Sequence, residues 1–246
     1  MTTKNAFFIV LILIIASCSQ QNQGENSSST ADSLAVSEPA APESVAAVSI
    51  WDNISVRATA DPDGKYLTRM NLGETLTYLG EEATAKDGKI YVKVKLNDGT
   101  EGWTRTEFVI PEAEPAAFVN ESDLYNRPDL LTKSSYKFSL MDIVAVSETS
   151  DDWVKVVGKP TGETWLKDGW VKMDNLSYED IDIATAKFAQ AALGADDPIV
   201  ALEEILTNSD LNASVFAEHI QDKIDELYAE DESDGGEMVV DSTSVE

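Results

Sequence analysis

Residues 91–103 read Tyr91-Val92-Lys93-Val94-Lys95-Leu96-Asn97-Asp98-Gly99-Thr100-Glu101-Gly102-Trp103, and the chain contains this pattern twice. The second copy begins Trp153-Val154-Lys155-Val156 and ends Asp168-Gly169-Trp170-Val171. Apolar and polar side chains alternate in both, which is the period of a β-strand with one buried face. Asn97-Asp98-Gly99 is typical of a tight hairpin turn. Each copy therefore predicts a strand, a turn and a second strand that begins at Gly-Trp.

The hairpin lies within a longer pattern that repeats after about 60 residues. In the first copy, predicted strands at residues 54–57 and 75–79 precede the hairpin, and in the second copy the corresponding strands lie at 124–128 and 140–146. Short strands separated by Gly-containing turns are typical of small β-barrels. The sequence therefore predicts a mainly β fold, with two small barrels in tandem followed by a short α-helical segment.

The motifs of this repeat resemble those of bacterial SH3-like (SH3b) domains. The first copy shows Ser55-Val56-Arg57, Leu72-Gly73-Glu74 and the Gly102-Trp103 hairpin in the order typical of that family. The second copy departs from it at Asn126-Arg127-Pro128 and at residues 139–142, where no Gly precedes the acidic residue. The resemblance implies SH3b-like barrels at residues 47–112 and 113–176. Members of the family often bind peptidoglycan or its stem peptides and often accompany wall hydrolases.

Aromatic residues provide the candidate site. Trp103 and Trp170, at the start of the closing strands, are predicted to be structural core residues, because large aromatics supply much of the buried area of a small barrel. Tyr91 and Trp153 point away from their Val neighbours, so they either line a surface groove or pack beneath a loop or between the barrels. Trp165 lies in a longer loop of the second copy and is the third predicted ligand-binding residue.

The amino terminus has the pattern of an export signal. Lys4 precedes an apolar run over residues 6–16, which is too short to span a bilayer. The ending Ile15-Ala16-Ser17-Cys18 resembles the lipobox of bacterial lipoproteins. That resemblance implies cleavage after residue 17, attachment of acyl chains such as palmitate to Cys18, and a lipid-anchored protein of the bacterial cell envelope that faces the periplasm. The alternative is an ordinary signal peptide with a chance Cys. Residues 18–46 are predicted to be a disordered tether.

The last quarter of the chain has a helical period. The apolar residues of 177–229 recur at helical spacing, with Ser177 predicted as the first N-cap and Asp197-Pro198 as the start of a second helix. A third helix is predicted after Asn212. Residues 177–246 carry 2 basic and 19 acidic side chains, out of 18 and 45 in the whole chain. Residues 230–246 are predicted to be a disordered acidic tail. A net charge of −27 argues against a nucleic-acid partner, because phosphates would be repelled.

The residue inventory argues against catalysis. The chain has one Cys and one His, and His219 alone cannot complete a nucleophile–base pair. No metal site and no cofactor are predicted, and Asp61-Pro62-Asp63-Gly64 is interpreted as a turn. We therefore expect a non-catalytic, membrane-tethered envelope adaptor whose barrels bind a peptide, a protein or a cell-wall component such as peptidoglycan. The alternatives are a scaffold whose acidic helices bind a protein partner, with the barrels as spacers, and an accessory to a wall hydrolase.

Overall fold

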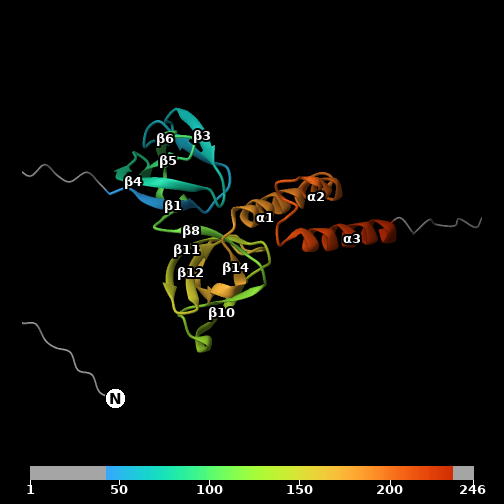
Figure 1. Ribbon diagram of the computed structural model, residues 1–246. Coiled ribbons are helices and arrows are strands. Elements are labelled where there is room, and N and C mark those ends of the chain that lie inside the picture. The colour runs from blue at the N-terminus through green and yellow to red at the C-terminus, as the bar shows by residue number, and fades with distance from the viewer. Residues whose placement is uncertain (1–42, 235–246) are drawn as a thin grey trace, which may run out of the picture. The chain divides into compact units, whose positions relative to one another are not determined.

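The computed structural model describes residues 43–234, which form two antiparallel sheets followed by three α-helices (Figure 1). The first sheet has seven strands in the order β3-β2-β6-β5-β4-β1-β7. Its strands are β1 (Val45–Ser49), β2 (Ile54–Arg57), β3 (Tyr66–Met70), β4 (Thr75–Thr84), β5 (Ile90–Leu96), β6 (Glu101–Arg105) and β7 (Val109–Pro111).

The second sheet also has seven strands, in the order β10-β9-β13-β12-β11-β8-β14. Each strand occupies the position that its counterpart seven places earlier holds in the first sheet, so the sequence repeat is also a repeat of topology. The strands are β8 (Glu114–Phe118), β9 (Ser122–Tyr125), β10 (Lys133–Phe138), β11 (Ile143–Ser150), β12 (Trp153–Gly158), β13 (Lys167–Lys172) and β14 (Leu176–Ser177).

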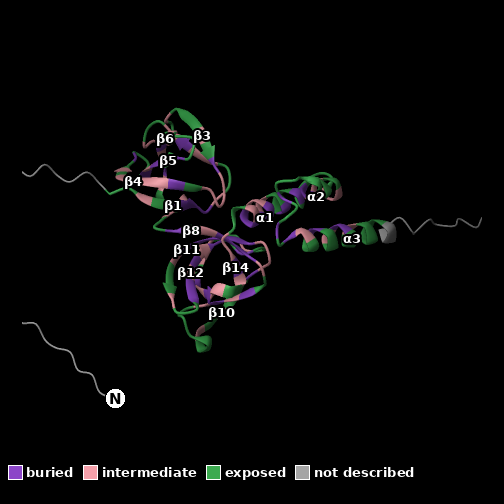
Figure 2. Ribbon diagram, in the orientation of Figure 1, coloured by how far each residue is buried: buried purple, intermediate pink, exposed green. Residues whose placement is uncertain are grey.

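The valines of the repeated motif form the buried face of each sheet. Val92, Val94 and Leu96 pack with Val56 and Met70 in the first sheet. In the second sheet the buried cluster contains Val154, Val156, Val171 and the stacked pair Phe118 and Phe138, whose ring centroids lie 4.8 Å apart. Figure 2 shows buried positions along the strands of both sheets and along α1. The alternation seen in the sequence therefore locates both cores correctly.

The first strand begins inside the segment that the sequence predicted to be a tether. β1 (Val45–Ser49) starts before residue 47 and pairs with β4 on one side and with β7 on the other. The tether prediction was wrong for these residues, because the strand is stabilised by partners about 30 and 60 residues away, which local sequence does not show. Residues 1–17, Cys18 and the rest of the predicted tether up to residue 42 lie outside the described residues.

A left-handed turn is kept in both copies although only one of them has glycine there. Gly73 has a φ of +76° and Met141, at the corresponding position, has a φ of +66°. In each turn a carboxylate accepts a backbone N–H: Glu74 from Asn71, and Asp142 from Ser139. The missing glycine in the second copy therefore leaves the turn intact, at the energetic cost that a side chain brings to this conformation.

Replacing Gly73 by alanine is expected to lower the free energy of unfolding by about 2 kcal/mol, whereas Gly88→Ala should cost about 1 kcal/mol. Both residues have a φ near +76° (+76° and +77°), so the backbone strain is matched. A Cβ at residue 73 would lie 3.2 Å from both Ile143 Cγ2 and Ile183 Cγ2, while a Cβ at residue 88 meets nothing within 4 Å. Urea titration of both variants measures the difference, and equal losses would contradict the predicted contact.

Three helices follow the second sheet: α1 (Asp180–Ala192), α2 (Pro198–Thr207) and α3 (Ala217–Asp234). Asp197 caps α2 as predicted, since its side chain accepts a hydrogen bond from the Val200 N–H at 3.1 Å. Ser177 is not the cap of α1: Glu179 occupies that position, and the Ser177 hydroxyl donates to Asp182. α3 extends to Asp234, past the boundary predicted at residue 229. No helix within residues 43–234 is long and apolar enough to cross a membrane.

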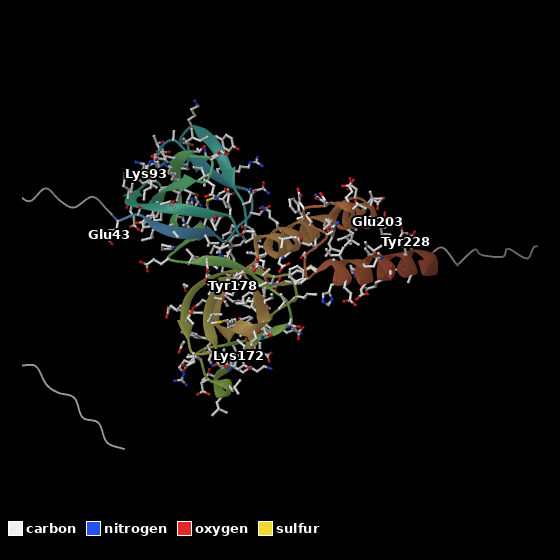
Figure 3. The ribbon with its side chains drawn as sticks, viewed as in Figure 1. Glu43, Lys93, Lys172, Tyr178, Glu203 and Tyr228 are labelled. Atoms are coloured by element: carbon white, nitrogen blue, oxygen red, sulfur yellow. The ribbon has the colours of Figure 1, made fainter. Side chains whose placement is uncertain are left out.

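The helices share one apolar cluster with the second sheet. Ile183, Ala186 and Ala189 of α1 pack with Ile143 and Ala117 of the sheet, and the same cluster includes these residues of α2, α3 and the segment between them: Leu202, Ile205, Leu211, Phe216, Ile220 and Ile224. α2 and α3 are also joined at their solvent side, where the Tyr228 hydroxyl donates to a Glu203 carboxylate oxygen at 3.1 Å (Figure 3). The single histidine, His219, is exposed on α3.

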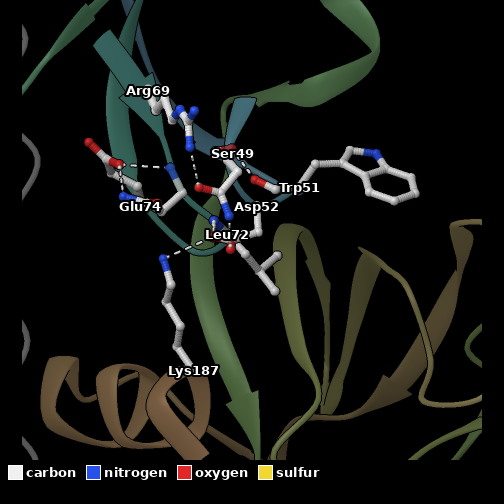
Figure 4. Close-up of polar contacts among 9 residues, drawn as sticks. Ser49, Trp51, Asp52, Arg69, Leu72, Glu74 and Lys187 are labelled. Carbon is white, nitrogen blue, oxygen red and sulfur yellow. Dashed lines mark hydrogen bonds and ion pairs between the residues drawn. The ribbon is translucent and has the colours of Figure 1, made fainter. Parts of the chain in front are cut away.

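An ion pair links α1 to the loop between β1 and β2. Lys187 Nζ lies 3.1 Å from Asp52 Oδ1, which also accepts the Leu72 N–H (Figure 4). Partial burial raises the pKa of Asp52, but the Lys187 ammonium and the N–H groups of Leu72 and Asn53 outweigh it, so the pKa lies below the ordinary value of 3.8. A lowered carboxyl pKa stabilises the fold above the unfolded-state pKa, and that stability is lost as the pH falls through the folded-state pKa.

Lys187→Met is therefore expected to lower the melting temperature at pH 7 by about 1–3 °C, a small change because the ion pair is partly exposed to solvent. The difference should shrink as the pH falls below 3.8 and vanish once the pH is below the folded-state pKa of Asp52, where the carboxyl is protonated. Thermal melts across this range test the prediction. In an Asp52→Asn background Lys187→Met should have no pH-dependent effect, and a difference that persists at low pH would contradict the assignment.

Candidate functional site

The first sheet carries a cavity of about 260 Å³ beside Tyr91, a residue that the sequence predicted to point away from the valines. It is lined by Tyr91 of β5 and by Thr104 and Arg105 of β6. Tyr91 lies directly opposite Arg105 in the strand pairing, whereas Thr104 lies opposite Val92. Its walls come from β2, the β2–β3 loop and the short 3₁₀-helix after β6, through these residues: Asn53, Ile54, Ser55, Arg57, Pro62 and Phe108.

One polar group in this cavity has no partner. Thr104 is 1% exposed, and its hydroxyl is the one buried side-chain oxygen or nitrogen between residues 43 and 231 that makes no hydrogen bond. Leaving a buried hydroxyl without a partner costs about 1–3 kcal/mol, so native proteins rarely do so without a reason. Thr104 is one of the residues that line the cavity, and its side chain shares the face of Val92.

Two guanidinium groups give the cavity its charge. The Tyr91 hydroxyl interacts with Arg105 and raises its pKa, with smaller contributions in the same direction from Glu107 and Asp87, so Arg105 is a permanent cation. The distances from the Arg105 guanidinium are 3.5 Å to Asp87 and 3.6 Å to Glu107. Arg57 donates to the carbonyl of Gly64 at 2.8 Å, which fixes the β2–β3 loop. The cavity is therefore lined by two guanidinium groups whose positions are fixed by contacts within the protein.

The corresponding position in the second sheet is filled by side chains. Trp153 takes the place of Tyr91, is 6% exposed, and packs edge-on against Tyr125 with ring centroids 4.9 Å apart. Lys172, in the place of Arg105, lies over the Trp153 ring at 4.0 Å and pairs with Asp152 (Figure 3 marks Lys172). A cation over an indole face and an edge-on aromatic pair are both favourable contacts. This arrangement gives Trp153 a packing role.

The structure corrects the prediction that Trp103 and Trp170 are core residues. Trp103 pairs with Lys93 and Trp170 with Lys155, so both tryptophans lie on the same face as the lysines, opposite the valines. Neither belongs to a buried cluster, and both are only half-buried. The prediction was wrong because a large aromatic was assumed to face the core, whereas strand register decides the face.

The sequence left two alternatives for Tyr91 and Trp153: they line a surface groove, or they pack beneath a loop or between the barrels. They do lie opposite the valines, but they are covered: Tyr91 is 3% exposed beneath the residues that line the cavity, and Trp153 lies beneath Lys172. Trp165, the third predicted ligand-binding residue, is 71% exposed in the β12–β13 loop. The structure does not bring these three aromatic residues into one site.

Sequence reasoning missed Thr104 and Arg105. A signal for Arg105 was present, because it follows Trp103 by two residues and therefore shares a face with Trp103 and with Tyr91 on the neighbouring strand. Thr104 could not be found in this way, since an unpartnered hydroxyl is a property of the packed structure. Within the described part of the chain, no group of three or more His, Cys, Asp or Glu residues could hold a metal ion. Asp61 and Asp63 instead pair with Lys86.

The comparison with protein families decides the nature of the first sheet, because the model of the bacterial SH3 domain matches residues 52–110. Residues 52–110 are a bacterial SH3 domain. The SH3 domain thus comprises β2 to β6 and the cavity, while the second sheet lies outside the matched residues. The chain has no match among curated proteins.

Two solved structures are similar to this chain over part of its length, NlpC2 and NlpC1 from Trichomonas vaginalis. NlpC2 is 13% identical, with 62% of this chain and 56% of that chain covered and a TM-score of 0.25. NlpC1 is 12% identical, with coverage of 63% and 55% and a TM-score of 0.24. The chain spans little more than half the length of either structure. At these scores neither is informative about the activity of this protein.

Proposed function

We propose that this protein is a non-catalytic adaptor of the bacterial cell envelope whose SH3 domain binds a peptide, such as the stem peptide of the cell wall, in the cavity over Tyr91. The observation that carries the proposal is the unpartnered hydroxyl of Thr104, which is one of the residues that line that cavity. A peptide offers both carbonyl acceptors and N–H donors, so it can satisfy a hydroxyl in either direction. Arg105, and Arg57 at the wall, suit a carbonyl or a terminal carboxylate of the same ligand.

The second sheet is proposed to be a second SH3-like domain with a mainly structural role. Its strand order repeats that of the first sheet, which supports the relationship. Its equivalent of the peptide cavity is occupied by Trp153, Tyr125 and Lys172, which argues against binding at that position. We assign peptide binding to the first domain for this reason.

The envelope location rests on the lipobox pattern that ends at Cys18. In this proposal Cys18 carries the acyl chains and holds the folded part near the membrane, because two or more chains give stable anchoring where one does not. Mass spectrometry of the protein purified from membranes tests it: Cys18 should be the first residue and should carry thioether-linked diacylglycerol. An unmodified protein released into the soluble fraction would overturn this part of the proposal.

The binding proposal is tested with the full chain and purified cell-wall sacculi. Thr104→Val keeps the shape of the side chain and removes the hydroxyl, so binding should weaken by about tenfold. The same change should leave the free protein as stable or about 1 kcal/mol more stable, because it removes an unsatisfied buried group. Thr106→Val, two residues away and exposed, is the matched control and should change neither quantity.

Two results would overturn the binding proposal: no saturable binding of the unsubstituted chain to sacculi, or equal binding by Thr104→Val and the unsubstituted chain. A stability loss in Thr104→Val would show that its hydroxyl has an internal partner. The non-catalytic part is tested separately by zymography on cell-wall substrate, in which a lytic band at the mass of this protein would refute it. Soluble stem peptides then distinguish a peptide ligand from the glycan of the wall.

A further inference from the structure

We infer that the protein has a second ligand site, for a pyranose sugar unit, in a cavity of about 490 Å³ beside Trp51. The cavity lies where three parts of the chain meet: the β1–β2 loop, the β12–β13 loop and α1. The residues that carry the inference are Trp51, Asp52, Asp142, Lys159, Thr161 and Gln190. It shares no lining residue with the peptide cavity, so the two proposals stand or fall separately.

The longer β12–β13 loop forms part of the wall of this cavity. Asp142 is 2% exposed and accepts hydrogen bonds from the Thr161 N–H at 3.1 Å and from the Thr161 hydroxyl at 2.7 Å. These two bonds fasten the loop to the turn before β11, and Lys159, Thr161 and Gly162 then form one wall of the cavity. These hydrogen bonds fix the position and the conformation of the extra loop residues in the second copy.

Several polar side chains of the cavity retain donors or acceptors that a ligand could use. Gln190 donates through Nε2 to the Met141 carbonyl at 2.8 Å, which leaves its carbonyl oxygen as an acceptor. Thr161 uses its hydroxyl proton on Asp142 and so also presents acceptor lone pairs. Asp52 is already paired with Lys187 and the Leu72 N–H. Lys159 forms no ion pair within residues 43–231, and its ammonium lies 5.9 Å from the centre of the Trp51 ring.

The remaining groups are therefore an indole face, two or more acceptors and one ammonium donor. Hydroxyl groups of a ligand can donate to the Gln190 and Thr161 oxygens, and the Lys159 ammonium can donate to a ligand oxygen. The half-buried Trp51 presents an apolar surface for the C–H face of a ring (Figure 4 shows the indole extending away from Asp52). A ring with an apolar face and several hydroxyl donors is a pyranose, and Lys159 also accommodates an acidic substituent.

The test uses the full chain and two soluble probes, a β-1,4-linked tetramer of N-acetylglucosamine and cellotetraose, with binding measured by calorimetry and by saturation-transfer NMR. We expect saturable binding of at least one tetramer, and an affinity about tenfold weaker in Trp51→Ala. Trp51→Phe should retain part of the affinity. Trp165→Ala is the control and should bind like the unsubstituted chain, because Trp165 is an exposed tryptophan of the β12–β13 loop that does not line the cavity.

Because Trp51 also contacts a buried cluster, Lys159→Met provides a second variant at an exposed position. It should weaken the binding of the probe without changing the melting temperature. Thr104→Val should leave sugar binding unchanged, which separates this site from the peptide cavity. The inference is overturned if neither tetramer binds saturably, or if both Trp51→Ala and Lys159→Met bind as tightly as the unsubstituted chain.

Discussion

Trp153→Ala is expected to lower the free energy of unfolding by about 3–5 kcal/mol, the range for removing a buried large aromatic side chain. Trp153 is 6% exposed, packs edge-on against Tyr125 and lies under the Lys172 ammonium. Alanine removes both contacts and leaves a cavity at this buried position. Urea titration followed by far-UV circular dichroism gives the change directly.

Trp170→Ala is the matched control, since it removes the same side chain from the neighbouring strand β13. Trp170 is half-buried and outside the buried clusters, so its loss should cost about 1–2 kcal/mol. Comparing the stability losses of the two variants tests which of the two tryptophans is a core residue. A larger loss for Trp170→Ala than for Trp153→Ala would show that the sequence-based assignment of Trp170 to the core had been right.

Asp182→Ala is expected to destabilise the protein by about 3 kcal/mol, because it leaves one buried and two partly buried donors without an acceptor. Asp182 is 2% exposed and accepts from the Ser214 hydroxyl at 2.7 Å, from the Val215 N–H at 3.0 Å and from the Ser177 hydroxyl. These bonds tie the first turn of α1 to the segment before α3 and to β14. Their loss should separate the helices and weaken the cluster around Phe216.

Asp180→Ala serves as the control for Asp182→Ala, since Asp180 is an exposed acidic residue in the same first turn. Its loss should change the stability by about 0.5 kcal/mol or less. Asp182→Asn keeps one acceptor oxygen, so its loss of stability should lie between those of Asp182→Ala and Asp180→Ala. Hydrogen exchange adds a structural readout, because amides of α3 should lose protection in Asp182→Ala. Equal stability of the two alanine variants would contradict the bridging role.

Much of the fold can be predicted from the chain because its signals are local. The Val92, Val94 and Leu96 alternation predicts the buried face of β5, and the Asn97-Asp98-Gly99 turn predicts the hairpin. The change to a helical period after residue 176 predicts three helices, and Asp197-Pro198 gives the start of α2. Each of these depends on residues close together in the sequence. β1 was missed because its partners are remote.

The candidate sites could be predicted only in part. Alternation places Tyr91 and Trp153 on the face opposite the valines, but whether such a face is open depends on what covers it. In the first domain the surrounding side chains leave a cavity beside Tyr91, and the hydroxyl of Thr104 has no hydrogen-bond partner. In the second sheet Tyr125 and Lys172 close the same position. A difference of a few side chains from other strands therefore separates a binding cavity from a packed surface.

The sequence by itself determined the repeat, the strand and helix periods and the acidic character of the helical end, since these follow from residue order and spacing. Tertiary structure alone decided which aromatic residues are covered, where the two cavities lie and which buried groups lack a partner. The physical reason is that a side chain's face is set by the local backbone, whereas its environment is set by strand pairing and by elements distant in the chain. The Gly-Trp hairpin is thus a marker of the fold, and the binding properties depend on the residues that pack around it.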